Sequence, residues 1–141
     1  MPPKKHSLTT PERTAVSARI ADRLAQSLPE MAAAYIFGSF VGQDSFGDID
    51  IGILLSTDEL DQPLAYELNI EIFLEKEIEL PVDVRVLNGA PLSFQQNVIR
   101  KGLLIVDKNP NRRAAFEGNV RKKYFDFSRF RRRYLKEIAH A

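Results

Sequence analysis

Apolar residues in the first part of the chain recur every four positions, the spacing of one face of an α-helix. The recurring residues are Val16, Ile20, Leu24 and Leu28. Thr10 and Pro11 suit the N-cap and the first helical position, and Pro29 ends the segment because proline cannot continue a helix. We therefore predict a helix with one buried face, preceded by a loose tail over residues 1–8.

Four short apolar runs predict β-strands. They are residues 31–37, 48–55, 82–87 and 102–106. The second run begins with alternating aspartate and isoleucine, and the third, VDVRVL, alternates throughout. Such alternation is typical of strands with one buried face.

Helical patterns separate and follow these strands. Leu60, Leu64, Leu68 and Ile72 repeat at helical spacing within a glutamate-rich segment, which predicts an amphipathic helix. Residues 91–101 suit a short helix. A long basic helix is expected over residues 109–138, with Asn109 or Asn111 as its cap.

The resulting order is helix, strand, strand, helix, strand, helix, strand, helix. It predicts a single domain over residues 1–141 of the α+β (α/β layered) class, a mixed sheet of about four strands with helices packed on it. The longest apolar runs are much shorter than the about 20 residues that cross a bilayer, and the N-terminus shows no secretory signal. With no cysteine, no disulfide or thiolate metal site is possible. We expect a cytoplasmic protein.

Charge is distributed unevenly along the chain, although its net charge is only +1. Residues 1–99 hold 7 basic and 15 acidic side chains, whereas residues 100–141 hold 13 basic and 4 acidic ones. One region can therefore attract cations, and another phosphates or an acidic partner.

Three aspartates on the alternating strands are the candidate catalytic and metal-binding residues. In a strand, side chains two apart share a face, so Asp48 and Asp50 project together while Ile49 faces the core. Asp83 and Arg85 share a face of the later strand. If the two strands are neighbours, Asp83 stands beside the other two carboxylates. A solvent-facing strand shows the same alternation, but all three features in this order favour a site.

Three clustered carboxylates repel one another, and a hard divalent cation such as Mg²⁺ compensates them. Two such ions clamp the attacking and leaving oxygens of a phosphoryl displacement. Asp48 and Asp50 would bind both metals and a triphosphate. Asp83 would bind the metal that activates the attacking hydroxyl, and it can also take the hydroxyl proton.

Gly38 and Ser39 lie between the first predicted strand and the aspartates. A glycine there lets the backbone approach a phosphate, and the Ser39 hydroxyl and neighbouring N–H groups can donate to its oxygens. Positive charge for the phosphates would come from Arg85, or from Arg100 and Lys101.

The segment IFGSFVGQDSFGDIDI, residues 36–51, resembles the G-S…D-x-D signature of the DNA polymerase beta-like nucleotidyltransferase superfamily. Asp83 matches the third carboxylate of that superfamily. The short chain looks like the minimal nucleotidyltransferase (MNT) group, and the aromatic and basic residues from Tyr124 to Glu137 resemble the tail of MNT proteins paired with HEPN-domain proteins.

This resemblance implies a nucleotidyltransferase-like fold and an antitoxin that uses Mg²⁺ or Mn²⁺ to transfer AMP from ATP to a hydroxyl, a tyrosine of a HEPN-type toxin. Two departures leave other functions open. Eight residues separate Ser39 from Asp48, where ten is common, and they include no arginine or lysine. The alternatives are a non-catalytic antitoxin that acts by binding, or a small-molecule (antibiotic-type) nucleotidyltransferase, for which the chain is short.

Arginines 129 and 131–133 lie among aromatic residues in the last predicted helix. This composition suits nucleic-acid binding, but Phe127, Phe130 and Tyr134 are spaced three and four apart, as in a stripe that packs against protein. We therefore do not expect nucleic acid as a partner, and because the apolar runs are short we do not expect a membrane. We predict that this helix helps hold an acidic, α-helical toxin subunit.

Overall fold

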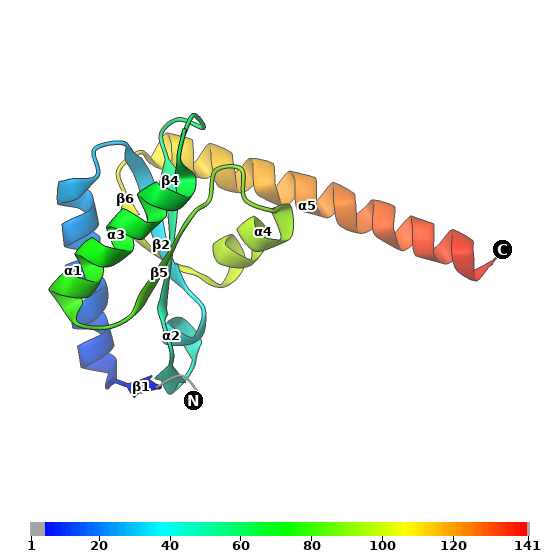
Figure 1. The fold of residues 1–141 in the computed structure, drawn as a ribbon. Helices are drawn as coiled ribbons and strands as arrows, with labels where there is room; N and C mark the ends of the chain where they lie inside the picture. Colours follow the sequence, from blue (N-terminus) through cyan, green and yellow to red (C-terminus); the bar gives the residue numbers. More distant parts are fainter. Residues whose placement is uncertain (1–4, 141) are drawn as a thin grey trace.

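The structure is a computed structural model that describes residues 5–140. Its elements, in chain order, are β1 (His6–Ser7), α1 (Thr10–Ser27), β2 (Met31–Phe37), α2 (Ser39–Gly42), β3 (Ser45–Phe46), β4 (Ile49–Leu55), α3 (Pro63–Ile78), β5 (Val82–Val86), α4 (Leu92–Lys101), β6 (Leu103–Asp107) and α5 (Pro110–Ala139). Helices α1 and α3 cover one side of the main sheet, and α4 and α5 lie on the other (Figure 1).

The main sheet of the described residues has four strands in the order β5-β4-β2-β6. Strand β2 runs antiparallel to both of its neighbours, whereas β4 and β5 are parallel. The expected mixed sheet with packed helices is therefore confirmed, and the two aspartate-bearing segments are indeed neighbours.

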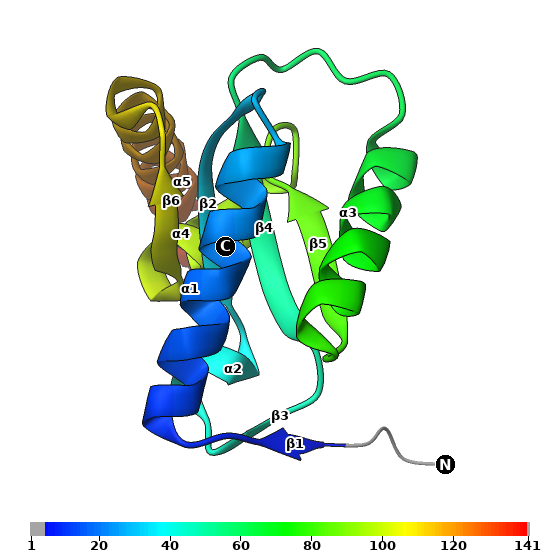
Figure 2. The same ribbon diagram turned by 90° about the vertical axis from the view of Figure 1, so that its left-hand side faces the viewer.

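Apolar side chains fill both sides of this sheet. On the side that faces α1 and α3 (Figure 2), Ile49, Ile51 and Ile53 are fully buried, together with Ile20 and Leu24 of α1. The opposite side buries a second group, formed by Ala32, Ala33, Tyr35, Phe37, Leu54, Leu87 and Val98. The alternation in the sequence thus correctly predicts which residues of β4 and β5 face the core.

The N-terminal segment differs from the prediction. Residues 1–4 of the predicted tail lie outside the described residues, but His6 and Ser7 form β1 and pair with β3 in an antiparallel ladder. The helix cap is Thr9 rather than Thr10, because Thr9 and Glu12 bond each other's backbone N–H groups in a capping box, an arrangement that stabilises a helix start.

Helix α3 buries a different face from the one that the spacing of its leucines predicts. Leu64, Leu68 and Ile72 are 76%, 51% and 49% exposed, and the buried residues of the helix are Ile70 and Leu74. Three residues of the predicted stripe therefore do not face the core, whereas Leu60, which precedes the helix, is partly buried against it.

Three glutamates of α3 face the sheet because β5 is an edge strand whose outer N–H groups have no neighbouring strand to bond. Glu67, Glu71 and Glu75 accept hydrogen bonds from the N–H groups of Val86, Val84 and Val82, at 2.7, 2.8 and 3.0 Å. The spacing of the glutamates along α3 matches that of the N–H groups along β5, since four helical residues rise about 6 Å and two strand residues about 6.6 Å. This glutamate ladder covers the edge of the sheet and holds α3 beside β5.

Helix α5 is anchored over its first half and projects from the body over its second half (Figure 1). Asn109 caps it by accepting from Arg112 N–H at 3.1 Å. The Tyr35 hydroxyl donates to the buried Glu117 carboxylate at 2.7 Å, and Arg113 pairs with Asp107 at 3.0 Å. Among residues 5–140, no helix is both long and apolar enough to cross a membrane.

Candidate active site

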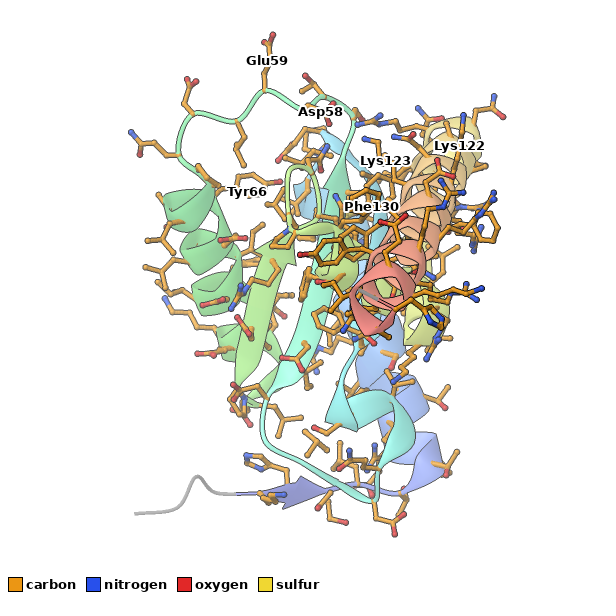
Figure 3. All side chains as sticks on the ribbon, turned by 90° about the vertical axis from the view of Figure 1, so that its right-hand side faces the viewer. Asp58, Glu59, Tyr66, Lys122, Lys123 and Phe130 are labelled. Carbon is orange, nitrogen blue, oxygen red and sulfur yellow. The ribbon has the colours of Figure 1, made fainter. Side chains whose placement is uncertain are left out.

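Asp50 and Asp83 face each other across the two parallel strands. Asp50 of β4 is the register partner of Asp83 of β5, and Phe37 of β2 is the partner of Asp50 on its other side. These three residues form one row on the side of the sheet that carries α4 and α5. In Figure 3, which faces this side, β4 and β5 are seen between α3 and α5.

The environment of Asp50 disfavours its negative charge. Burial, followed by the nearby negative charges of Asp83 and Asp48, raises the pKa of Asp50 to about 6, against an opposing effect of Arg85. Glu71 of the glutamate ladder also has a raised pKa, because it is partly buried and lies beside Asp83. Such mutual repulsion is relieved when a cation binds between the carboxylates.

Asp48 does not lie in the strand, contrary to the prediction. It is exposed in the bend that precedes β4. Within residues 5–140, no group of three or more acidic or histidine side chains is arranged to hold a metal ion by itself. The aspartates therefore do not form a complete protein cage.

The donor set nevertheless has the chemistry that Mg²⁺ needs. This ion is usually bound by one or two carboxylates, together with water and substrate phosphates, rather than by an all-protein cage. The facing pair Asp50 and Asp83 supplies two carboxylates. Asp48, two residues earlier, lies close enough to act on the pKa of Asp50.

Gly38 packs directly against the Asp50 carboxylate. Its φ of +77° lies in the left-handed half of backbone space, and a Cβ at this position would lie 2.1 Å from Asp50 Oδ2. Only glycine therefore fits, for conformational and steric reasons together. Ser39, the first residue of α2, follows Gly38 directly.

The predicted basic residues lie at two places in the structure. Arg85 Nε lies 3.7 Å from Asp83 Oδ1, and both residues line a groove of about 620 Å³ between α3 and the segment after β5. Arg100 and Lys101 end α4 just before Leu103, which pairs with Ile36. They therefore lie at the end of the sheet where β2 leads into Gly38.

Two residues that lie close to the predicted site residues were not identified from the sequence. Glu71 lies beside Asp83, and glutamates spaced by four ahead of an alternating strand were a signal that could have revealed it. Arg13 contacts the backbone of the segment after Ser39, and nothing in the sequence pattern indicates this contact.

A known protein family matches the central part of the chain. The family described as "Polymerase beta, Nucleotidyltransferase" matches residues 19–111, which include Gly38, Ser39 and all three aspartates. The chain belongs to this nucleotidyltransferase family. No curated protein sequence matches the chain.

Solved structures of toxin–antitoxin complexes share the fold. A chain of the tri-AMPylated Shewanella oneidensis HEPN toxin in complex with MNT antitoxin superposes with a TM-score of 0.69 at 20% identity, over 89% of this chain and 98% of that one. A toxin–antitoxin MntA-HepT structure has a TM-score of 0.68 and 19% sequence identity, over 89% of this chain and 97% of that one. A toxin–antitoxin structure with AMP-PNP has a TM-score of 0.69 and 21% identity, over 86% of this chain and 97% of that one.

Proposed function

We propose that the protein is an Mg²⁺-dependent nucleotidyltransferase that transfers AMP from ATP to a protein hydroxyl. The observation that carries the proposal is the pairing of Asp50 with Asp83 against Gly38, within a domain of the nucleotidyltransferase family. A bound divalent cation, Mg²⁺ or Mn²⁺, would neutralise the carboxylates and the phosphates of ATP.

The residues have separable roles in this reaction. The acceptor oxygen forms a bond to the α-phosphorus of ATP while the bond from that phosphorus to the bridging oxygen breaks, and pyrophosphate leaves. Asp83 takes the hydroxyl proton. Asp48 and Asp50 would hold the cation and, through it, the triphosphate. Gly38 and Ser39 would contact the phosphate oxygens, with Arg85 as an additional positive charge.

We propose as acceptor a tyrosine of a HEPN-type toxin, with this chain acting in the cytoplasm as the antitoxin. The support is the shared fold with MNT antitoxin complexes, one of which holds an AMPylated toxin. A second candidate, neutralisation by binding alone, is favoured by the exposed position of Asp48 and by the short loop before it.

The projecting half of α5 supplies a surface for this partner. Exposed aromatic residues Phe127, Phe130 and Tyr134 lie along it, and Lys122 and Lys123 lie on the same helix, as Figure 3 shows for Phe130 and the two lysines. Aromatic anchors surrounded by basic residues fit an acidic protein surface, because the rings bury area and the charges steer association.

Incubation of the wild-type protein with labelled ATP, Mg²⁺ and a cognate HEPN-type toxin tests the proposal. Label on a toxin tyrosine, located by mass spectrometry, is the expected result. Asp83→Asn should abolish the label and keep much of the nucleotide binding. Tight binding of the toxin without label would establish the binding-only alternative, and equal labelling by Asp83→Asn would remove Asp83 from the site.

A further inference from the structure

The loop between β2 and β4 carries candidate phosphate and metal contacts at both ends. Gly38 and Ser39 begin it, and Asp48 ends it. The residues between, 40–47, include one acidic side chain and no basic one. The shape of this loop therefore determines how far Ser39 lies from Asp48, and the loop itself supplies no positive charge to a triphosphate.

One arginine from a distant helix holds this loop. Arg13, the fourth residue of α1, donates from Nε to the Leu8 carbonyl at 3.2 Å, from Nη1 to the Phe40 carbonyl, and from Nη2 to the Asp44 carbonyl at 2.7 Å. A single guanidinium thus joins two loop positions that lie four residues apart.

Aromatic rings of the loop enclose the same guanidinium. Its central carbon lies 5.4 Å from the centre of the Phe40 ring and 5.3 Å from that of Phe46. The two rings pack edge to face with their centres 4.9 Å apart. Cation–π contacts of this kind add to the hydrogen bonds, and together they place Arg13 at a fixed point behind the loop.

Strand β1 reinforces the attachment. His6 and Ser7 pair with Phe46 and Ser45 of β3, and the Ser7 hydroxyl donates to the Asp44 carbonyl at 3.4 Å. The segment from His6 to Arg13 therefore contacts the middle of the loop through strand pairing and side-chain hydrogen bonds. Arginine suits the central contact because its planar, always charged fork presents several donors in a fixed geometry, which lysine cannot reproduce.

We propose that Arg13 is a positioning residue for nucleotide binding, and this inference rests on the proposed function. By fixing the backbone at Phe40 and Asp44, Arg13 sets the separation between Ser39 and Asp48, so that both reach the triphosphate of one nucleotide. Its charge behind the loop also offsets the lack of a basic residue within it. The side-chain hydrogen bonds of Arg13 go to the backbone carbonyls of Leu8, Phe40 and Asp44 and not to the facing aspartates.

The test measures Mg²⁺–AMP-PNP binding by calorimetry, well below the melting temperature of each variant. Arg13→Gln removes the fork, and the milder Arg13→Lys keeps the charge without it. Misalignment of the loop weakens hydrogen bonds to the charged phosphates, and loss of one such bond lowers affinity about ten- to a hundredfold. We therefore expect Kd to rise about ten- to a hundredfold in Arg13→Gln and less in Arg13→Lys. In AMP transfer, the KM for ATP should rise more than kcat falls.

Two control variants separate positioning from general stability. Arg19→Gln removes an exposed arginine of the same helix, which lies 3.6 Å from Glu77. Tyr66→Phe removes a 2.6 Å hydrogen bond to Glu30 away from the loop and lowers stability without touching it. Both controls should bind AMP-PNP as the wild type does.

Wild-type affinity in both Arg13 variants would overturn the inference and leave the proposed function standing. If both Arg13 variants fail to fold while Tyr66→Phe folds, the role of Arg13 is purely structural. That result would also overturn the inference. Absence of AMP-PNP binding in the wild type would overturn the proposed function and this inference together.

Discussion

Removal of one carboxylate from the glutamate ladder should destabilise the protein measurably. Glu71→Ala leaves the Val84 N–H, which now donates at 2.8 Å, without its acceptor in a partly buried place. Leaving a buried donor unpaired costs about 1–3 kcal/mol. Relief of the repulsion between Glu71 and Asp83 offsets part of this, so we expect a net loss of about 1–2 kcal/mol.

The corresponding change in melting temperature follows from the size of the protein. Unfolding entropy is about 2.1 cal/mol/K per residue, which for 141 residues amounts to about 0.3 kcal/mol/K. A loss of about 1–2 kcal/mol then lowers Tm by about 3–7 °C. Glu71→Gln keeps an oxygen acceptor and removes the repelling charge, so it should stay within about 0.5 kcal/mol of the wild type.

Urea unfolding followed by circular dichroism, with calorimetry for Tm, measures these differences. Glu59→Ala is the control, because Glu59 is an exposed glutamate on the loop between β4 and α3 (Figure 3). It should change stability by less than about 0.5 kcal/mol. Wild-type stability in Glu71→Ala would refute the idea that the ladder holds α3 on the sheet edge, as would equal losses in the alanine and glutamine variants.

Three further changes test other parts of the structure. In EDTA at about pH 8, where Asp50 is ionised, Asp50→Asn should stabilise the protein by about 1–2 kcal/mol, since it removes a partly buried charge beside other carboxylates. A loss of stability by urea titration would contradict this. Gly38→Ala should cost at least about 2 kcal/mol and weaken nucleotide binding, whereas Gly42→Ala, whose added Cβ meets nothing within 4 Å, should do neither. Reversal of arginines 131–133 to glutamate should slow toxin association and flatten its salt dependence, with the fold unchanged; unaltered stopped-flow rates would show that α5 is only a solvated surface.

The sequence predicts the pairing of the aspartates because alternation carries positional information. Both β4 and β5 place isoleucine or valine on one face, so the acidic residues must lie on the other. Neighbouring strands then bring Asp50 beside Asp83. The same reasoning does not place Asp48, because alternation does not fix where a strand starts and β4 begins one residue after it.

The orientation of α3 could not be read from its leucines. Which face of the helix turns inward depends on the free N–H groups of β5, and the sequence does not state that β5 is an edge strand. Strands β1 and β3 are two residues each, too short for a periodic pattern. The contacts of Arg13 likewise depend on segments that meet only in the folded chain.

Nucleotide-dependent metal binding tests the central claim most directly. In differential scanning fluorimetry, Mg²⁺ with AMP-PNP should raise the melting temperature of the wild type, because a ligand that binds only the native state stabilises it. Asp22→Asn, a change on the exposed face of α1, should keep this shift. The double variant Asp48→Asn with Asp50→Asn should lose it, whereas a shift equal to that of the wild type would contradict the assignment of the site.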